Sequence, residues 1–317
     1  MSGRRVVAIG GGTGLPRVLS ALLAAGEHPT AIVTMADDGG SSGCLRQTYG
    51  MLPPGDVRNC LVALAEPGSD LAGLFQYRFV EGEGLAGHPV GNLVLAALTN
   101  LTGSFPEAIT TASRMLGSRG SVLPSTLSDV VLMADDADGR RIEGQATIAH
   151  AQGLKRVFLD PADPPAYPPA LAAIADADAV ILGPGSLYTS LMPNLLVDGI
   201  IAALRSTPAR VLYVCNVANQ RGETFGMDCA DHVAALLDHG MAGIVDAVLV
   251  HAGAPSAGGR AQPSADSDPE PVVCGAPERE RLGALGVETI AADLVDSADL
   301  RHHDVGRLAA ALGRVLG

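Results

Sequence analysis

The hydrophobic pattern at the start of the chain predicts a strand, a helix and a second strand. An apolar run at residues 5–9 suits a buried parallel strand, a helical period covers residues 15–25, and a second apolar run covers residues 31–35. Glycine-rich segments follow the two strands, at residues 10–14 and 36–43. In a right-handed parallel unit these loops open at the carboxyl edge of the sheet, so ligand contacts are expected there.

The same alternation of apolar runs and helical periods returns in the second half of the chain. Residues 156–159 are expected to resume the sheet, and a helix from about residue 304 to residue 316 closes the chain. Further strands are expected at residues 179–183, 211–216, 245–250 and 288–294. The pattern predicts an α/β, Rossmann-like, doubly wound fold with a mostly parallel sheet.

Three segments depart from this alternation. Residues 56–117 are mainly helical, which predicts a helical elaboration, and residues 130–148 alternate like two strands around a turn at Asp138–Gly139, which predicts one antiparallel hairpin. Residues 253–270 are rich in Gly, Ser, Pro and Asp and have no apolar period, so a mobile loop is expected. Because strand and helix patterns resume after this loop, residues 1–317 are expected to form a single domain.

Composition excludes several classes of protein. The 317 residues are 47% hydrophobic and 17% charged, so a sizeable core can be buried. A net charge of −13 opposes a nucleic-acid or anionic-membrane surface, and no apolar run reaches the roughly 18 residues of a membrane-spanning helix. Lys155 is the single lysine and GxxxxGK[ST] is absent, which excludes a P-loop. The start of the chain lacks the apolar stretch of a secretory signal, so a cytoplasmic location is expected.

The five cysteines give no sign of a metal or disulfide framework. They are scattered and form no CxxC pair, so reduced thiols are expected.

The first glycine-rich turn is a candidate phosphate site. It comprises Gly10, Gly11, Gly12, Thr13 and Gly14, directly before a predicted helix. Glycines let the backbone approach an anion, and a helix N-terminus supplies free N–H groups. The turn is not GxGxxG, so NAD is disfavoured, and a tight turn with no ligand remains an alternative.

The second strand ends in acids and hydroxyls. Asp37 and Asp38 stand where an acid of a dinucleotide fold binds ribose, and Ser41 and Ser42 follow them. The carboxylates suit Mg²⁺, which prefers oxygen ligands, so a Mg²⁺ ion near Asp37 and Asp38 is a possible cofactor. The alternative is a solvated turn.

Polar side chains also gather at two predicted helix starts. Asp56, Arg58 and Asn59 follow the Pro53–Gly55 turn, where Asp56 is either a ligand-binding acid or a simple N-cap. Asn92 follows His88 at the second start, and a lone histidine there is more often structural than catalytic.

A second candidate phosphate loop follows the strand at residues 179–183. Its residues proposed for ligand binding are Gly183, Gly185, Ser186, Thr189, Ser190 and Asn194, and Asn216 ends the next strand at the same edge. Ser186 is a poor nucleophile candidate because GxSxG is absent. Convergence of two glycine loops on one rim favours a phosphorylated ligand over either loop taken separately.

These motifs together resemble one family. GGGTGL, VTMADDGGSSGCLR, PPGDVRNCLVAL, GHPVGNLVLAAL, VLPST and ILGPGSLYTSLMPNLLV, with DHV near Asp231, resemble the YvcK group of the CofD-like family over nearly the whole chain. The resemblance implies a Rossmann-like core and a gluconeogenesis factor, a cytoplasmic bacterial protein that binds UDP-sugars and affects cell shape, cell-wall homeostasis and carbon use. The transferase branch of the family instead joins a phospholactyl-type group to the deazaflavin precursor of coenzyme F420, with Mg²⁺.

The resemblance also implies roles for particular residues. The first turn with Thr13 and the GPGSLYTS loop would hold a nucleotide diphosphate, with Asp37 lining the same cleft. Arg301 matches an arginine that the group uses for UDP-sugars, and Asp56 would be the catalytic residue if chemistry occurs.

The leading interpretation is a regulatory protein that binds UDP-N-acetylglucosamine or UDP-glucose without turnover. It is expected to form a homo-oligomer, a dimer, and to act through protein partners. The alternatives are the F420-type transferase and, more weakly, a nicotinamide oxidoreductase. Turnover is disfavoured because Asp56 begins a predicted helix, where N–H groups should lower its basicity.

Overall fold

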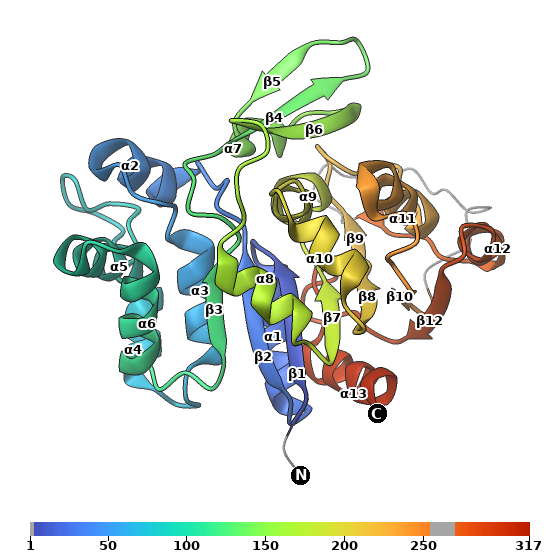
Figure 1. The fold of residues 1–317 in the computed structure, drawn as a ribbon, viewed down its shortest axis with the longest axis horizontal. Coiled ribbons are helices and arrows are strands. Elements are labelled where there is room, and N and C mark those ends of the chain that lie inside the picture. The colour runs from blue at the N-terminus through green and yellow to red at the C-terminus, as the bar shows by residue number, and fades with distance from the viewer. Residues whose placement is uncertain (1–2, 254–269) are drawn as a thin grey trace.

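The central sheet of the computed structural model has seven strands that run parallel, in the order β12-β10-β8-β7-β1-β2-β3 (Figure 1). The structure describes residues 3–253 and 270–317. The strands are β1 (Arg5–Gly10), β2 (His28–Val33), β3 (Ser121–Pro124), β7 (Ala179–Leu182), β8 (Arg210–Val214), β10 (Ala247–His251) and β12 (Glu288–Ala292). The predicted α/β, doubly wound architecture is confirmed.

Strand order reverses at β1. From β1 the chain moves outward through β2 to β3, and it later returns to pair β7 with the other side of β1 before moving out to β12. Because each crossover is right-handed, the two directions place their helices on opposite faces of the sheet. In Figure 1, α8 (Pro168–Ala175) and α10 (Ile200–Ser206) lie in front of the sheet. The helices α1 (Gly14–Ala24) and α13 (Val305–Leu316) pack against each other on the far side.

The central strands consist almost entirely of buried apolar residues. Every residue of β7 is buried, as are five of the six residues of β1. This is the pattern of parallel strands that are covered on both faces. The core therefore lies on both sides of β1 and β7, and it fixes the positions of the loops that follow them.

The helical elaboration forms the left side of Figure 1 and confirms the helical interpretation of residues 56–117. Its helices are α3 (Gly55–Leu64), α4 (Asp70–Gln76), α5 (Val90–Thr102) and α6 (Phe105–Met115). Helix α2 (Gly40–Tyr49) precedes the predicted range and packs against α5. Helix α3 packs against α1, so the elaboration is attached to the sheet beside the first glycine turn.

The antiparallel hairpin is confirmed, but it belongs to a larger unit than expected. The strands β4 (Val131–Asp136) and β5 (Arg141–Glu143) pair antiparallel around the Asp138–Gly139 turn. The third strand of this small sheet, β6 (Leu154–Asp160), pairs antiparallel with β4. Residues 156–159 were expected to resume the central sheet, and that expectation is wrong. Three of the seven residues of β6 are exposed and only two are buried, as suits the outer sheet at the top of Figure 1, whereas the central strands are buried on both faces.

Two further boundaries differ from the sequence pattern. The apolar period of residues 193–204 predicts one helix, but the structure has two there, α9 (Met192–Leu195) and α10, preceded by η1 (Leu187–Leu191), a π-helical turn. The break occurs at Gly199, whose φ of 92° is left-handed and ends a regular helix. The short edge strand β3 was missed because it ends in Pro124, a residue that only an edge strand tolerates well.

The remaining elements complete the right side of the molecule. They are β9 (Ala218–Asn219), α11 (Cys229–Leu236), η2 (Leu237–Met241), β11 (Glu270–Pro271) and α12 (Ala276–Ala284). Helix α7 (Gln145–Ile148) instead lies at the top of Figure 1, against β4 and β5. The mobile loop expected at residues 253–270 lies, from 254 to 269, outside the described residues. No helix in the described part of the chain is long and apolar enough to cross a membrane.

Two of the five cysteines are paired, which corrects the expectation of reduced thiols. Cys229, at the start of α11, forms a disulfide with Cys274, just before α12, across 45 residues of sequence and with the two Cα atoms 5.4 Å apart. Cys44, Cys60 and Cys215 are free thiols. Spacing in the sequence gave no signal because tertiary packing of α11 against α12 brings the pair together.

Reduction of this disulfide is expected to lower the free energy of unfolding. Closing a loop of this length stabilises a folded chain by about 2–4 kcal/mol, because it restricts the unfolded state. The measurement is denaturant unfolding with and without dithiothreitol, with Cys44→Ser as the control variant. Alkylation of the denatured, unreduced protein should label three cysteines, in keeping with the three free thiols. Labelling of all five would contradict the pairing.

Candidate functional site

The candidate site lies where the strand order reverses. The first glycine turn follows β1, and the second glycine loop follows β7, the neighbouring strand on the other side of the reversal. A cleft of about 660 Å³ opens at this edge. Its walls are formed by the glycine turn, the GPGS loop, the segment after β8 and a late loop, through Gly12, Thr13, Gly14, Arg17, His150, Pro184, Gly185, Ser186, Asn216–Gly222, Glu270, Arg301, His302 and His303. In open α/β sheets, ligands bind at this switch point.

The two glycine loops touch each other at the floor of the cleft. A Cβ atom placed on Gly14 would lie 2.3 Å from the carbonyl oxygen of Pro184, and one on Gly185 would lie 3.2 Å from the carbonyl oxygen of Gly11. Helix α1 begins at Gly14, with Thr13 as its N-cap, so its first N–H groups lie at the cleft. A helix start of this kind is a ready-made anion site.

Asp56 lies behind the first glycine turn, and its position corrects the expected basicity. Its Oδ2 accepts the N–H of Gly12 at 2.8 Å, which lowers the carboxyl pKa. Burial and the nearby charge of Asp37 act more strongly in the opposite direction and raise the pKa of Asp56 to about 7. The expectation that a helix start would lower the basicity of Asp56 is therefore wrong, because desolvation outweighs the hydrogen bond. Because the Gly12 N–H donates to Asp56, it is already hydrogen-bonded within the protein.

The paired aspartates at the end of β2 have different roles. Both oxygens of Asp38 accept backbone N–H groups of α7, from Gln145 at 3.0 Å and Ala146 at 2.8 Å. Asp38 therefore anchors the projecting sheet, the three-stranded sheet of β4, β5 and β6 to which α7 is connected. Asp37 accepts the N–H of Gly39 with Oδ1, and its Oδ2 lies 3.0 Å from the position of a Cβ on Gly55. Asp37 is therefore the acid that faces Asp56.

A polar network extends from this pair into the helical elaboration. The buried guanidinium of Arg58 donates to Asn92 at 3.0 Å and to Asn59 at 2.6 Å. Asn92 donates in turn to Ser41, which is hydrogen-bonded to His88 at 2.8 Å. Burial lowers the pKa of Arg58 to about 10. These residues come together beside Asp37 and Asp56, and none of them lines the 660 Å³ cleft.

One more hydroxyl joins the two loops of the helical side. Ser42 Oγ accepts the N–H of Gly55 at 3.2 Å, and a Cβ on Gly55 would lie 2.6 Å from that oxygen. The glycine therefore allows the start of α3 to approach α2. Ser42 holds the segment that carries Asp56.

The second glycine loop divides into a cleft-facing part and a buried part. Gly185 and Ser186 line the cleft, whereas Thr189, Ser190 and Asn194 are at most 4% exposed. Asn194 donates to the carbonyl oxygen of Gly10 at 3.0 Å and so ties the loop to the end of β1. Gly183 has a φ of 66°, a left-handed conformation that suits glycine at the exit of β7.

Sequence reasoning missed Glu223, a buried acid behind the second loop. Its Oε2 accepts the N–H of Tyr188 at 3.1 Å, and its Oε1 accepts the hydroxyl of Thr189. Burial raises the pKa of Glu223 to about 7. No pattern in the sequence marked it, because it is a single acid in a polar turn. The N–H of Tyr188, at the helix start where a phosphate was expected, is thus taken by a side chain of the protein.

Arg301 also lines the cleft, from the loop that precedes α13. It is paired with Asp299 through two hydrogen bonds of 2.8 Å, and its side chain is 66% exposed. This pairing lowers the pKa of Asp299. The guanidinium is therefore fixed in orientation while one edge remains open to solvent.

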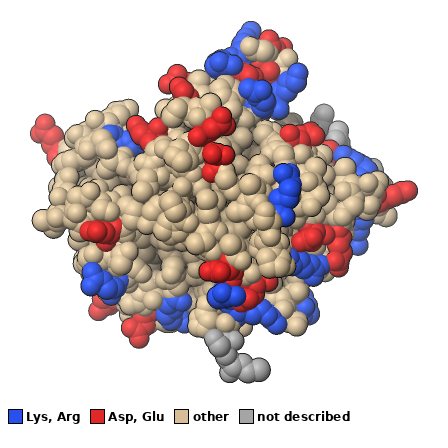
Figure 2. Space-filling model, viewed as in Figure 1, with Lys and Arg blue, Asp and Glu red and all other residues tan. Residues whose placement is uncertain are grey.

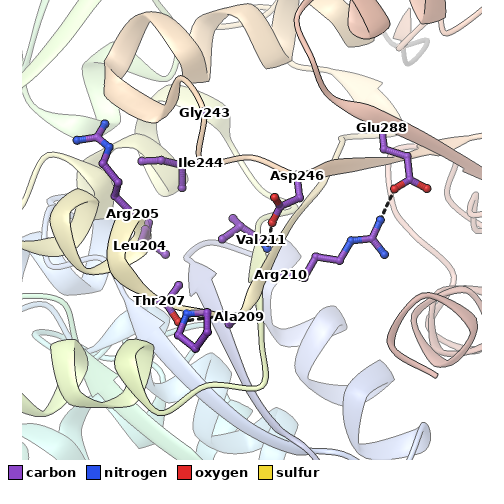
Figure 3. Close-up of a pocket in the computed structure, with 11 residues that line it drawn as sticks. Leu204, Arg205, Thr207, Ala209, Arg210, Val211, Gly243, Ile244, Asp246 and Glu288 are labelled. Atoms are coloured by element: carbon purple, nitrogen blue, oxygen red, sulfur yellow. Dashed lines mark hydrogen bonds and ion pairs between the residues drawn. The ribbon is translucent and has the colours of Figure 1, made fainter.

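A second hollow, of about 580 Å³, lies at the amino edge of the sheet, away from both glycine loops (Figure 3). Its charged groups already have partners: Arg210 pairs with Glu288, and Asp246 accepts the N–H of Val211 at 2.7 Å. Figure 2 shows acidic and basic side chains interspersed over the visible face, with no continuous basic surface for a nucleic acid. The cleft at the carboxyl edge is therefore the better candidate site.

This geometry defines an α/β protein with a cleft at its topological switch point, where helix α1 begins. Comparison with known proteins then assigns the family. The family model described as 2-phospho-L-lactate transferase CofD matches residues 6–295. The chain belongs to the CofD family.

Curated relatives and solved structures refine this assignment. The chain is 45% identical to the gluconeogenesis factor of Halalkalibacterium halodurans, over 98% of this chain and 96% of that protein. It is 43% identical to the gluconeogenesis factor of Bacillus subtilis, over 97% and 96% of the two chains. A crystal structure of a UPF0052 family member from Bacillus halodurans superposes with a TM-score of 0.90 at 44% identity, covering 98% of this chain and 99% of that one. The resemblance to gluconeogenesis factors of the CofD-like family is confirmed.

Replacing Gly14 with alanine is expected to separate the two glycine loops. The added Cβ would lie 2.3 Å from the Pro184 carbonyl oxygen, so the backbone must shift. Overpacking of this kind costs about 1–3 kcal/mol of stability. The measurement is thermal unfolding beside Gly313→Ala, where a Cβ meets nothing within 4 Å. Equal melting temperatures for the two variants would contradict the close contact.

Replacing Asp56 with asparagine is expected to stabilise the protein above neutral pH. The folded pKa of about 7 exceeds the unfolded value of 3.8, so the wild type loses stability as pH rises between these values. The amide has no such loss. Asp56→Asn should therefore match the wild type near pH 4 and exceed it by about 1–3 kcal/mol at pH 8. Denaturant unfolding across this range measures the difference. A lower stability of Asp56→Asn at pH 8 would contradict the raised pKa.

Proposed function

We propose that this protein is a bacterial regulatory protein that binds a UDP-sugar, such as UDP-N-acetylglucosamine or UDP-glucose, in the cleft between the two glycine loops. The observation that carries the proposal is the start of α1 in a cleft of about 660 Å³ that Arg301 also lines. A cleft of this volume suits a ligand of nucleotide size. Backbone N–H groups hold a diphosphate without net positive charge, which fits a chain of net charge −13.

In this proposal the diphosphate lies against Thr13 and Gly14, with Ser186 and Arg301 on the two walls. The protein acts in the cytoplasm as a homodimer and links nucleotide-sugar levels to carbon metabolism, cell shape and cell-wall homeostasis through protein partners. The match to gluconeogenesis factors supports the metabolic part of this role.

A Mg²⁺ ion fits beside the cleft. Asp37 and Asp56 each use one carboxylate oxygen for a backbone N–H group, so each retains a second oxygen. Mg²⁺ takes one or two protein carboxylates and completes its shell with phosphate and water. This donor set suits an ion shared with the ligand, whereas the described residues hold no cluster of three or more acidic, histidine or cysteine ligands. Asp38, which caps α7, is not needed for this arrangement.

A second candidate function is group transfer of the F420 type, and Asp56 is the observation that favours it. A carboxylate whose pKa is about 7 is suited to accept a proton at neutral pH. In that reaction Asp56 would take the proton of the acceptor hydroxyl, the hydroxyl oxygen would bond to the phosphorus of the phospholactyl group, and the bond to the guanylyl group would break to release GMP, while the arginine and the helix start hold the phosphates. The family model is named for a transferase, whereas the curated relatives are named gluconeogenesis factors, so turnover is measured directly.

Turnover is tested by chromatography of the nucleotide. The protein is incubated with UDP-N-acetylglucosamine and Mg²⁺, and separately with the deazaflavin acceptor and a guanylylated phospho-donor. The proposal predicts intact nucleotide in the first incubation and no F420-type product in the second. Product formation that Asp56→Ala abolishes would replace the binding role with the transferase.

Replacing Arg301 with alanine is expected to weaken UDP-N-acetylglucosamine binding about 10- to 100-fold. A charge-assisted hydrogen bond to phosphate contributes about 1.5–3 kcal/mol, and that contribution would be lost. Isothermal titration calorimetry measures the dissociation constant, with the exposed Arg114 on α6 replaced by alanine as the matched control. An unchanged dissociation constant for Arg301→Ala would leave the diphosphate to backbone groups alone.

A further inference from the structure

The turn after β9 forms one wall of the cleft and also reaches behind the second glycine loop. Gln220 and Gly222 line the cleft, whereas the next two residues, Glu223 and Thr224, are 5% and 1% exposed. The Gln220 N–H donates to Thr224 Oγ1 at 3.0 Å, which closes the turn. One short segment therefore has a ligand-facing side and a buried side.

The buried side of this turn is hydrogen-bonded to η1. Glu223 accepts the N–H of Tyr188 at 3.1 Å with one oxygen and the hydroxyl of Thr189 with the other. These are the first residues of a helix, where backbone N–H groups have no partner within the helix. The Glu223 carboxylate, which comes from a different segment, therefore caps the N-terminus of η1. The N-cap residue of η1, Ser186, makes no capping hydrogen bond with its own side chain.

The cleft-facing side of the loop is held by the same segment. The Ser186 hydroxyl donates a hydrogen bond to Gln220 Oε1 at 2.8 Å. Gly185 and Asn216 exchange two hydrogen bonds, with the Gly185 N–H donating at 3.1 Å and the Asn216 amide donating at 2.8 Å. Residues 216–223 therefore hold the loop at three points, and Glu223 is the buried, ionisable one.

We propose that Glu223 is a positioning residue for the ligand cleft: its buried carboxylate caps η1 and thereby holds Gly185 and Ser186 in the orientation that receives the phosphate groups. The proposal rests on the function proposed above. Glu223 does not touch the ligand. It acts through the second glycine loop, which contacts the ligand in this proposal. Because Glu223 holds that loop in place before binding, less conformational entropy is lost when the ligand binds.

The ionisation of Glu223 makes this role measurable. As a carboxylate it accepts from both Tyr188 and Thr189; once protonated, it gives up one acceptor. Burial raises its pKa to about 7, so this change falls within an accessible range of pH. Of the other titratable groups here, Tyr188 is on η1, and Asp231 on α11 and Asp238 on η2 act on that tyrosine with the same negative sign.

Three variants separate positioning from simple packing. Glu223→Gln keeps the shape and mimics the protonated carboxyl, Glu223→Ala removes the cap, and Glu81→Ala is the matched control on an exposed acid. Binding of UDP-N-acetylglucosamine is measured by calorimetry at pH 6 and pH 8. Its diphosphate diester does not titrate in this range, and Asp56 is common to all variants, so the ratio of dissociation constants reports on Glu223 alone.

Glu223→Gln should bind as well as the wild type at pH 6 and about 5- to 10-fold more weakly at pH 8, where the wild type is ionised. Glu223→Ala should bind about 10-fold or more weakly at both values. A Gln-to-wild-type ratio that is the same at both pH values, or wild-type affinity for Glu223→Ala, would overturn the positioning role.

Hydrogen exchange of the ligand-free proteins tests the contact without reference to any ligand. The Tyr188 amide should exchange faster in Glu223→Ala than in the wild type and the Glu81→Ala control. An unchanged rate would refute the cap. If the wild type binds no UDP-N-acetylglucosamine while this amide still loses protection, the UDP-sugar function fails and the capping contact stands.

Discussion

The close approach of the two glycine loops, across the pair of strands where the sheet reverses, is the constraint on which the rest of the structure depends. Hydrogen bonding of β1 to β7 fixes their carboxyl ends side by side. The loops that follow must then pass within contact distance, and Gly14 permits this because a Cβ there would strike the Pro184 carbonyl oxygen. The cleft, the start of α1 and residues 216–223, which are hydrogen-bonded to the second loop, are all arranged around this contact.

Buried acids surround this contact on both sides. Asp56 holds the first loop through Gly12, and Glu223 holds the second through Tyr188. Burial raises the pKa of each carboxyl to about 7. Each acid accepts a backbone N–H group of its loop, so the protein itself orders both glycine loops. The raised pKa values cost stability at neutral pH, as is common at functional sites.

Much of this arrangement was predictable from the sequence. The buried runs that became β1, β7, β8 and β10 and the positions of the two glycine loops follow from hydrophobic periodicity and turn residues. The motif resemblance gave the family, which the comparisons confirm. The antiparallel hairpin was predicted because its alternation marks one exposed face.

The remainder depends on tertiary contacts that periodicity does not encode. The third strand of the projecting sheet, β6, looks like a core strand until its partner β4 is known. The pKa of Asp56 was expected to fall because a helix start was visible, whereas its burial and its neighbour Asp37 were not. The role of Glu223 could not be predicted from the sequence, because a single acid in a polar turn matches no motif. Its role is visible only in the structure, where it accepts hydrogen bonds from Tyr188 and Thr189.

The most direct test of the account is a crystal structure of the protein grown with UDP-N-acetylglucosamine and Mg²⁺. The account predicts density for the diphosphate at the start of α1, between Thr13–Gly14 and Ser186, with Arg301 turned toward it. Density for the nucleotide in the hollow between Arg210 and Asp246 at the opposite edge of the sheet, with the switch-point cleft empty, would contradict it.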